Sequence, residues 1–188
     1  MEFLHTPPGA FLELKRNKMK NRTYWLIGSG LLGVILLAGC RSMPENAKPV
    51  TNFQPDRYLG KWYEIARFDY RFERDLNNVT AQYSLNDDGT IKVANSGYNY
   101  KKNEWKSASG KAKFRGDRGT AALKVSFFGP FYSGYNVVAI DEGYQYALVA
   151  GKSLQYLWIL SRTPAIPEEI RQGFLKKAQD IGYDTSKL

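Results

Sequence analysis

Cys40 is the residue whose chemistry follows most directly from the sequence, because it is the only cysteine among 188 residues. An apolar stretch at residues 25–38 leads into it, and three basic residues precede that stretch: Lys18, Lys20 and Arg22. A basic segment, a short apolar segment and small residues before a cleavage point are typical of a secretory signal peptide, here residues 1–39. At ~1.5 Å per residue the apolar stretch rises ~21 Å, short of the ~30 Å hydrocarbon core, which disfavours a membrane-spanning helix.

Residues 37–40 read Leu-Ala-Gly-Cys and resemble the bacterial lipobox, in which the thiol is diacylated and the new amino terminus is then acylated. The resemblance implies that acyl chains such as palmitate anchor the protein, since two or more chains bind a membrane stably. Residues 40–52 are then expected to be an acylated tether. Arg41 stands where an aspartate would favour inner-membrane retention, so we expect anchoring to the outer membrane, facing the periplasm. Met19 is a better initiator than the first methionine, because two prolines and two acidic residues precede the basic cluster.

The charge of the mature segment does not favour nucleic acids. Five of the 27 basic residues and two of the 18 acidic residues lie before Cys40, so the remaining about 149 residues carry 22 and 16, a net charge near +6. The basic side chains are scattered, with no run of five, and nucleic-acid binding is not expected. Attraction to anionic lipid head groups fits this charge better, although solubility alone explains it equally well.

The only histidine is His5, which lies in the segment that would be removed. The mature domain would then lack an imidazole base and a histidine metal ligand, which excludes Ser–His and Cys–His catalysis and the common zinc sites. We predict no catalytic residue, no metal site and no cofactor. Catalysis by carboxylates, lysine or tyrosine stays formally open. Most acidic residues, however, lie in predicted turns such as 87–89 and 141–143, where their turn-forming role explains their presence without catalysis.

The body of the chain is predicted to consist of eight short strands. Residues 79–86 alternate apolar and polar side chains without an exception, and 107–115 and 121–127 follow the same period of two. The eight predicted strands are 60–68, 79–86, 90–98, 107–115, 121–127, 135–141, 144–151 and 157–161. Antiparallel strands joined to their sequence neighbours favour an all-β, up-and-down barrel, because closure removes exposed edges, while spacing alone leaves a sandwich open.

Small residues on the predicted inner faces favour a hollow barrel over a filled one. These residues are Ala66, Ala108, Gly110, Ala112, Ala121 and Ala139. The interior of an eight-stranded barrel just accommodates side chains or one small ligand. Alternation alone does not assign the faces of a barrel whose exterior also makes apolar contacts, so a filled core stays an alternative.

Three motifs, in order along the chain, resemble those of the lipocalin family. Gly60-Lys61-Trp62 followed by residues 63–67 matches the first motif, Asp141 with residues 144–147 resembles the second, and residues 157–162 resemble the third. Residues 124–131 look like the bacterial outer-membrane lipocalins in particular. The resemblance covers residues 53–188 and implies an eight-stranded antiparallel barrel with a C-terminal helix packed outside it.

Chain order places the three motifs at one end of such a barrel. The first strand begins there and the eighth ends there, so Arg162 can stack on the Trp62 ring, a contact that contributes ~0.5–2 kcal/mol. We predict that Gly60, Trp62, Asp141 and Arg162 close the barrel and are structural rather than catalytic. The opposite end is the mouth, with aromatic loops at 69–74 and 127–132. Their rings either contact a membrane, a partner or a ligand, or fold inward and stopper the barrel.

After residue 163 the pattern changes to that of a helix. Glu168 and Glu169 lie in its first turn and Gly182 just beyond its last. An apolar stripe at helical spacing is formed by Ile170, Phe174, Ala178 and Ile181. The family usually continues into a further short strand, and the sequence given ends at Leu188, so a homodimer that uses this strand stays open.

The resemblance implies a membrane-anchored carrier that stores or transports fatty acids or lysophospholipids for membrane maintenance under stress. The candidate cavity residues are Ala66, Tyr83, Ala112, Phe114, Leu123, Val125, Phe127, Phe131 and Tyr135. Arg71 or Arg74 would meet a phosphate or carboxylate head group at the mouth. Two alternatives belong to other classes: a barrel-fold enzyme acting on a small lipophilic substrate, and a protein-docking envelope lipoprotein with a filled core.

Overall fold

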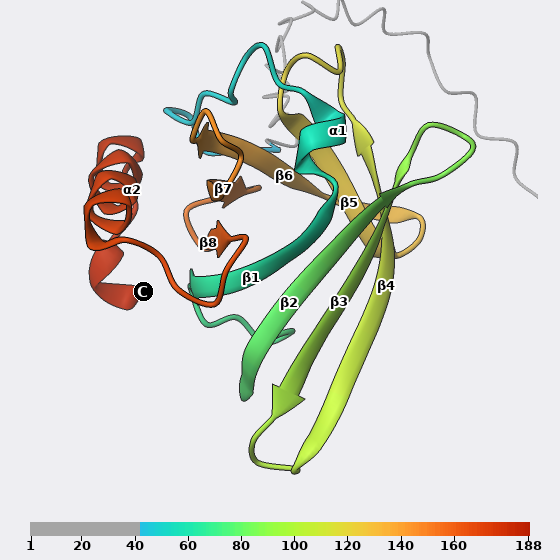
Figure 1. The fold of residues 1–188 in the computed structure, drawn as a ribbon, viewed down its shortest axis with the longest axis vertical. Helices are drawn as coiled ribbons and strands as arrows, with labels where there is room; N and C mark the ends of the chain where they lie inside the picture. The colour runs from blue at the N-terminus through green and yellow to red at the C-terminus, as the bar shows by residue number, and fades with distance from the viewer. Residues whose placement is uncertain (1–41) are drawn as a thin grey trace, which may run out of the picture. The chain divides into compact units, whose positions relative to one another are not determined.

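The computed structural model describes residues 42–188, so the predicted signal peptide, the acylation site Cys40 and Arg41 lie outside the described residues. Eight antiparallel strands form a closed barrel in which each strand pairs with its sequence neighbours and β8 returns to β1 (Figure 1). The strands are β1 (Gly60–Arg67), β2 (Leu76–Leu85), β3 (Ile91–Asn99), β4 (Glu104–Phe114), β5 (Ala122–Phe128), β6 (Phe131–Ile140), β7 (Tyr146–Gly151) and β8 (Leu157–Ser161). The up-and-down barrel is confirmed, and the sandwich is excluded.

The apolar side chains of the barrel form two clusters, one inside it and one outside. The inner cluster is built around Trp62 and includes Leu123. The outer cluster joins Leu148 and Ile159 of the barrel to Phe174 of helix α2 (Glu168–Ile181). The C-terminal helix therefore packs against the outside of the barrel, as predicted (Figure 1).

Two of the four register shifts between paired strands change the face of residues predicted to lie inside. The register between β1 and β8 shifts between Glu64 and Ala66, and the register between β6 and β7 shifts between Val137 and Ala139. The extra residue of a bulge interrupts the strict alternation of faces. Ala66 and Ala139 therefore pack in the outer cluster. This corrects the expectation that both are small residues of the inner face, and it removes Ala66 from the cavity.

The segment before β1 is fixed to the barrel. The Val50 N–H donates to the carbonyl of Val137 at 2.9 Å, and the Val50 carbonyl accepts from the N–H of Ala121 at 2.8 Å. Arg115 Nη1 donates to Ser42 Oγ at 2.6 Å. The predicted tether at residues 40–52 is therefore wrong for its described part, since residues 42–52 belong to the folded domain.

Strand direction defines the two ends of the barrel. The connections after β2, β4 and β6 lie at the closed end, together with α1 (Pro55–Tyr58), which leads into β1. The connections after β1, β3, β5 and β7 lie at the mouth. A single 3₁₀ turn, η1 (Thr185–Lys187), follows α2. Within residues 42–188, no helix has the length and apolar character needed to cross a membrane.

Candidate ligand-binding site

Arg162 ties together the backbone segments that meet at the closed end. Its guanidinium carbon lies 3.9 Å from the centre of the Trp62 ring, and Trp62 is fully buried. Nη1 donates to the carbonyl of Lys61 at 2.8 Å, Nη2 to that of Arg57 at 2.7 Å, and Nε to that of Tyr144 at 3.2 Å. One side chain thus connects α1, the start of β1 and the β6–β7 turn.

Gly60 and Asp141 shape the same end. Gly60 has a φ of +94°, in the left-handed region that favours glycine, and a Cβ there would lie 3.3 Å from Arg162 Nη1. The Asp141 carboxylate accepts hydrogen bonds from the backbone N–H groups of Gln145 at 2.7 Å and Tyr146 at 2.6 Å. The four residues predicted to close the barrel therefore lie at its closed end and contact backbone and rings.

Aromatic rings fill the barrel beside Trp62. The Phe53 ring centre lies 5.3 Å from that of Tyr58, 6.4 Å from that of Phe114 and 5.9 Å from that of Tyr144. Such ring pairs contribute about 0.5–1.5 kcal/mol each beyond the area that they bury. Phe114, predicted to contact a ligand, belongs to this plug instead, because it ends β4 at the closed end.

Beyond the plug, the barrel encloses a cavity of about 580 Å³ that reaches the mouth. This volume falls within the ~300–1,000 Å³ range of small-molecule sites. Seven predicted residues line the cavity: Tyr83, Ala112, Leu123, Val125, Phe127, Phe131 and Tyr135. The barrel is hollow above its plug, which argues against a filled core. Contact of these seven residues with a ligand stays a prediction.

Arg71 and Arg74 lie at the mouth, as expected, but do not line the cavity. Both are exposed on the β1–β2 connection, where the Arg71 guanidinium carbon lies 5.2 Å from the ring centre of Phe72. Lys106, near the start of β4, and Lys152, in the β7–β8 connection, line it instead. Neither lysine has a spacing that distinguishes it from the other scattered basic residues of the sequence.

The aromatic loop at the β5–β6 tip combines the two orientations considered from sequence. Phe127 is half-buried and lines the cavity. Its ring lies so close to Gly110 that a Cβ on the glycine would come within 2.8 Å of Phe127 Cδ1. Phe128 and Phe131 also line the cavity, at its mouth, but are 74% and 78% exposed. One ring of this tip is thus half-buried, and two are largely in contact with solvent.

Three tyrosines form a hydrogen-bonded group in the cavity wall, next to the plug. The hydroxyl oxygen of Tyr135 lies 2.6 Å from that of Tyr58 and 2.9 Å from that of Tyr83. Burial raises the pKa of Tyr83 to about 12 and raises the pKa values of Tyr58 and Tyr135 well above the ordinary range. The phenols therefore stay protonated at neutral pH. Three protons serve two mutual hydrogen bonds, so one proton is left to donate to a water or ligand oxygen.

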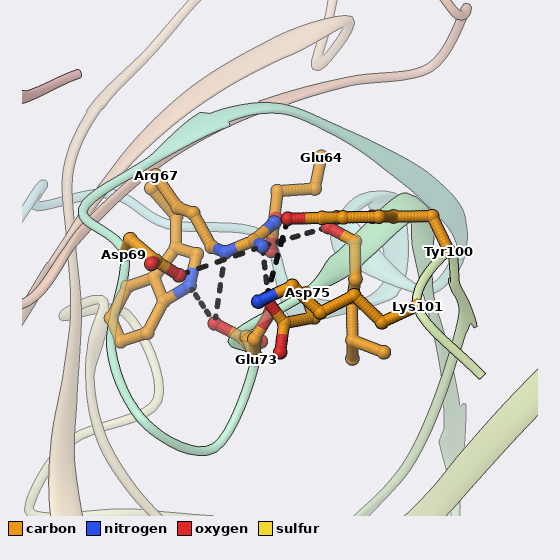
Figure 2. A network of polar contacts seen from close by, with 9 residues as sticks. Glu64, Arg67, Asp69, Glu73, Asp75, Tyr100 and Lys101 are labelled. Carbon is orange, nitrogen blue, oxygen red and sulfur yellow. Dashed lines mark hydrogen bonds and ion pairs between the residues drawn. The ribbon is translucent and has the colours of Figure 1, made fainter.

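An ionic cluster lies in the wall nearer the mouth (Figure 2). Arg67 Nη1 donates to Glu64 Oε1 at 2.5 Å, and Nη2 donates to the carbonyls of Glu73 at 2.7 Å and Leu76 at 2.8 Å. The Glu73 carboxylate accepts from Trp158 Nε1 at 3.0 Å. Arg67 therefore holds the backbone of the β1–β2 connection against the barrel, while Glu64, Glu73 and Trp158 line the cavity.

The protonation of Glu64 is set by this cluster, which places the carboxylates of Glu64, Asp69 and Glu73 within 4.0 Å of one guanidinium. Burial of Glu64 and the negative charge of Glu73 raise the pKa of Glu64 to about 7, against the opposing effect of Arg67. The wall of the cavity therefore changes charge near neutral pH. Within residues 42–188, no group of three or more His, Cys, Asp or Glu side chains could hold a metal ion.

Glu64→Gln is expected to flatten the dependence of stability on pH. The folded-state pKa of about 7 exceeds the ordinary value of 4.5. Glu64 therefore contributes stability that is fully present below pH 4.5 and is lost as the pH rises through about 7. Glutamine keeps an acceptor for Arg67 but does not titrate. The free energy of unfolding in urea, measured in steps across this range, checks the prediction. Glu169→Gln, exposed on α2, is the control. If the free energy of unfolding of Glu64→Gln depended on pH as steeply as that of the parent, the prediction would be contradicted.

The sequence did not identify Glu64, Arg67, Glu73 or Tyr58 as site residues. Strict alternation predicts opposite faces for positions 64 and 67, and the bulge between them brings the two side chains into contact. Tyr58 ends a single helical turn, which has no detectable period. The available signal was a pair of opposite charges, Glu64 and Arg67, inside a predicted strand.

Known proteins share this arrangement. The family described as Lipocalin-like domain matches residues 53–188. The outer membrane lipoprotein Blc of Escherichia coli (strain K12) is 55% identical over 155 residues, which cover 81% of this chain and 88% of that protein. The outer membrane lipoprotein Blc of Vibrio cholerae is 50% identical over 159 residues, which cover 84% of this chain and 93% of that protein. The closed barrel, its arginine-closed end and its open cavity are the features of a lipocalin-type β-barrel. The chain belongs to the lipocalin family.

Solved structures show the same fold at low sequence identity. Insecticyanin from the tobacco hornworm Manduca sexta has a TM-score of 0.61 and 22% identity, covering 75% of this chain and 81% of that one. Lobster apocrustacyanin A1 has a TM-score of 0.56 and 16% identity, covering 77% and 89%. At these identities the similarity concerns the fold alone.

Proposed function

We propose that this lipocalin is an acylated outer-membrane lipoprotein that holds a fatty acid or a lysophospholipid in its barrel. The observation that carries the proposal is the cavity, with about 580 Å³ of space, largely apolar walls and charged groups toward the mouth. A single apolar tail would displace poorly bonded water from it. Each buried methylene contributes ~0.8 kcal/mol, so affinity should depend on tail length.

The head group would lie at the mouth, close to Lys106 and Lys152, which can donate to a phosphate or carboxylate. Glu64 and Glu73 line the same cavity, and the negative charge of Glu64 opposes an anion there. Because the pKa of Glu64 is about 7, entry of an anionic amphiphile would be accompanied by proton uptake at Glu64. Binding of a fatty acid should then strengthen as the pH falls through neutrality.

The anchor and its location are supported by the lipobox resemblance at residues 37–40 and by the relatives, which are named outer membrane lipoproteins. Within this proposal the role is storage or transport of membrane lipids during stress. The cavity also suits an enzyme acting on a lipophilic substrate. We favour the carrier because the cluster in its wall holds its one guanidinium in contacts to backbone and Glu64 rather than toward the cavity.

Mass spectrometry of the full-length protein under native conditions tests the carrier. We expect one fatty acid or lysophospholipid per chain, recovered unchanged after prolonged incubation with excess ligand. Steady conversion of the ligand would support an enzyme, and an empty barrel that binds neither lipid class would exclude the carrier. The same spectra report the mass of the assembly and so test the homodimer.

Cys40→Ser is expected to abolish acylation and signal-peptide processing, because a serine hydroxyl lacks the thiolate nucleophilicity that acyl transfer needs. Incorporation of labelled palmitate and the mass of the mature chain measure both effects. Ser42→Ala, two residues further along, is the matched control and should be acylated normally. Quantitative palmitate incorporation by Cys40→Ser would contradict the proposed anchor.

A further inference from the structure

The exposed apolar side chains of this protein are concentrated at one end. Eight large apolar side chains are exposed within residues 42–188, and all but one lie at the mouth; the exception is Leu85 at the closed end. Each mouth connection, or a strand end beside it, contributes at least one of them. We call five of these residues the mouth patch: Phe72, Trp105, Phe128, Phe131 and Leu154. A water-facing cavity entrance does not need such a ring, whereas contact with an apolar phase does.

Charged residues are also distributed unevenly between the two ends of the barrel. The mouth connections, residues 68–75, 100–103, 129–130 and 152–156, contain five basic and three acidic residues. The closed-end connections, residues 86–90, 115–121 and 141–145, contain two basic and five acidic residues. An anionic lipid surface contributes ~1 kcal/mol for each nearby lysine or arginine, so this asymmetry orients the mouth toward it.

Ser42, the first residue that the structure describes, lies against the outside of β6, at about the middle of that strand. Arg115 and Asn136 hold Ser42 on the outer side of β6, where a Cβ on Gly134 would collide with the Ser42 carbonyl. Gly134 lies three residues from Phe131, or ~10 Å along the strand, and six residues from the closed-end terminus of β6. Cys40 is two residues before Ser42 and thus within ~7 Å of it. Acyl chains on Cys40 would therefore be within reach of a membrane surface that Phe131 contacts.

We propose that the mouth patch inserts into the anionic phospholipid surface that carries the acyl anchor, so that the cavity opens directly toward the bilayer. The reach of the anchor rests on the acylation proposed above, whereas the patch and the charge asymmetry do not. A single-tailed lipid passes between bilayer and barrel without exposing its tail to water, with aromatic rings and lysines at the boundary where each type of side chain is favoured.

Site-specific labels on the full chain, reconstituted into vesicles, test this proposal. Phe131→Cys and Leu85→Cys are labelled separately with the environment-sensitive fluorophore NBD, since acylation blocks the thiol of Cys40. Both positions are exposed, at 78% and 48%, and they lie at opposite ends of the barrel. The vesicles are phosphatidylcholine, with or without phosphatidylglycerol, and carry a nitroxide on the acyl chains. Palmitate incorporation and co-sedimentation are measured in parallel.

We expect a blue shift and about twofold quenching at position 131, stronger with phosphatidylglycerol, and no quenching at position 85. Co-sedimenting protein with an unquenched label at 131 would overturn docking while leaving the anchor intact. Quenching at 131 without palmitate incorporation, reproduced with Cys40→Ser so that only position 131 carries the label, would support docking and refute the anchor. Protein that stays in solution at millimolar lipid would overturn both. A label at 131 that is blue-shifted before vesicles are added, with a doubled native mass, would assign the patch to a second copy and also overturn docking.

Discussion

Arg162→Ala should lower the free energy of unfolding by about 3 kcal/mol. The substitution leaves three backbone carbonyls without their charged donor, at Lys61, Arg57 and Tyr144, and removes the cation from the Trp62 ring. Hydrogen bonds to a charged group contribute ~1.5–3 kcal/mol each, and the cation–π contact ~0.5–2 kcal/mol. Their sum is reduced here because part of the guanidinium remains in contact with water, where screening weakens its interactions. Urea unfolding measures the effect.

Two variants control for the loss of a positive charge. Arg162→Lys keeps a cation near Trp62 but loses the planar fork that reaches three carbonyls, so we expect an intermediate loss. Arg118→Ala removes an exposed guanidinium whose carbon lies 5.6 Å from the ring centre of Phe114 and should change stability by less than about 0.5 kcal/mol. Fatty-acid affinity, measured well below the melting transition, should stay near that of the parent in every case. A large loss of affinity at unchanged stability would place Arg162 in the binding site.

Ala112→Trp should weaken fatty-acid binding at least about tenfold, which corresponds to ~1.4 kcal/mol. Ala112 is buried and lines the cavity, between its register partners Ile91 of β3 and Val125 of β5. The indole would occupy space that the ligand's tail needs. In the empty protein the same ring extends into the cavity, so the melting temperature of the delipidated variant should stay near that of the parent. Fluorescent fatty-acid titration and thermal unfolding measure the two effects.

The control for Ala112→Trp is Lys92→Trp, which adds the same side chain at an exposed position beside Ile91. It should alter neither affinity nor stability appreciably. In a close-packed core, enlarging a buried alanine costs ~1–3 kcal/mol or more. A collapse of stability in Ala112→Trp would therefore show that the cavity closes in solution and would count against the carrier. Unchanged affinity would indicate that the tail of the fatty acid binds elsewhere in the cavity.

The barrel itself was predictable because its determinants are local. Alternation over residues 79–86 and turn chemistry at Asp88-Gly89 specify neighbouring strands that pair with one another. The structure has β2 and β3 where the pattern placed them, within three residues at each end. Chain order then determines which loops share an end, so the positions of Trp62 and Arg162 followed without any knowledge of side-chain contacts.

Face assignment failed where a bulge intervened. Ala66 and Ala139 were expected inside the barrel and lie outside it, because one extra residue in the strand shifts the register. The position of that extra residue is set by hydrogen-bond pairing with the neighbouring strand. The same shift brings Glu64 and Arg67 together. The position of a bulge depends on the partner strand, which a period of two along one strand does not report.

The sequence by itself determined a signal-peptide pattern ending at Cys40, eight strands in an antiparallel order, a closed end marked by Trp62 and Arg162, and a helix at the C-terminus. Only the tertiary structure decided that the barrel is hollow, that Phe53 and Tyr58 plug one end of it, and that Glu64 titrates near neutral pH. The reason is physical. Periodicity and turn residues act through neighbours in the chain, whereas a cavity, a ring plug and a shifted pKa arise from groups that only folding brings together.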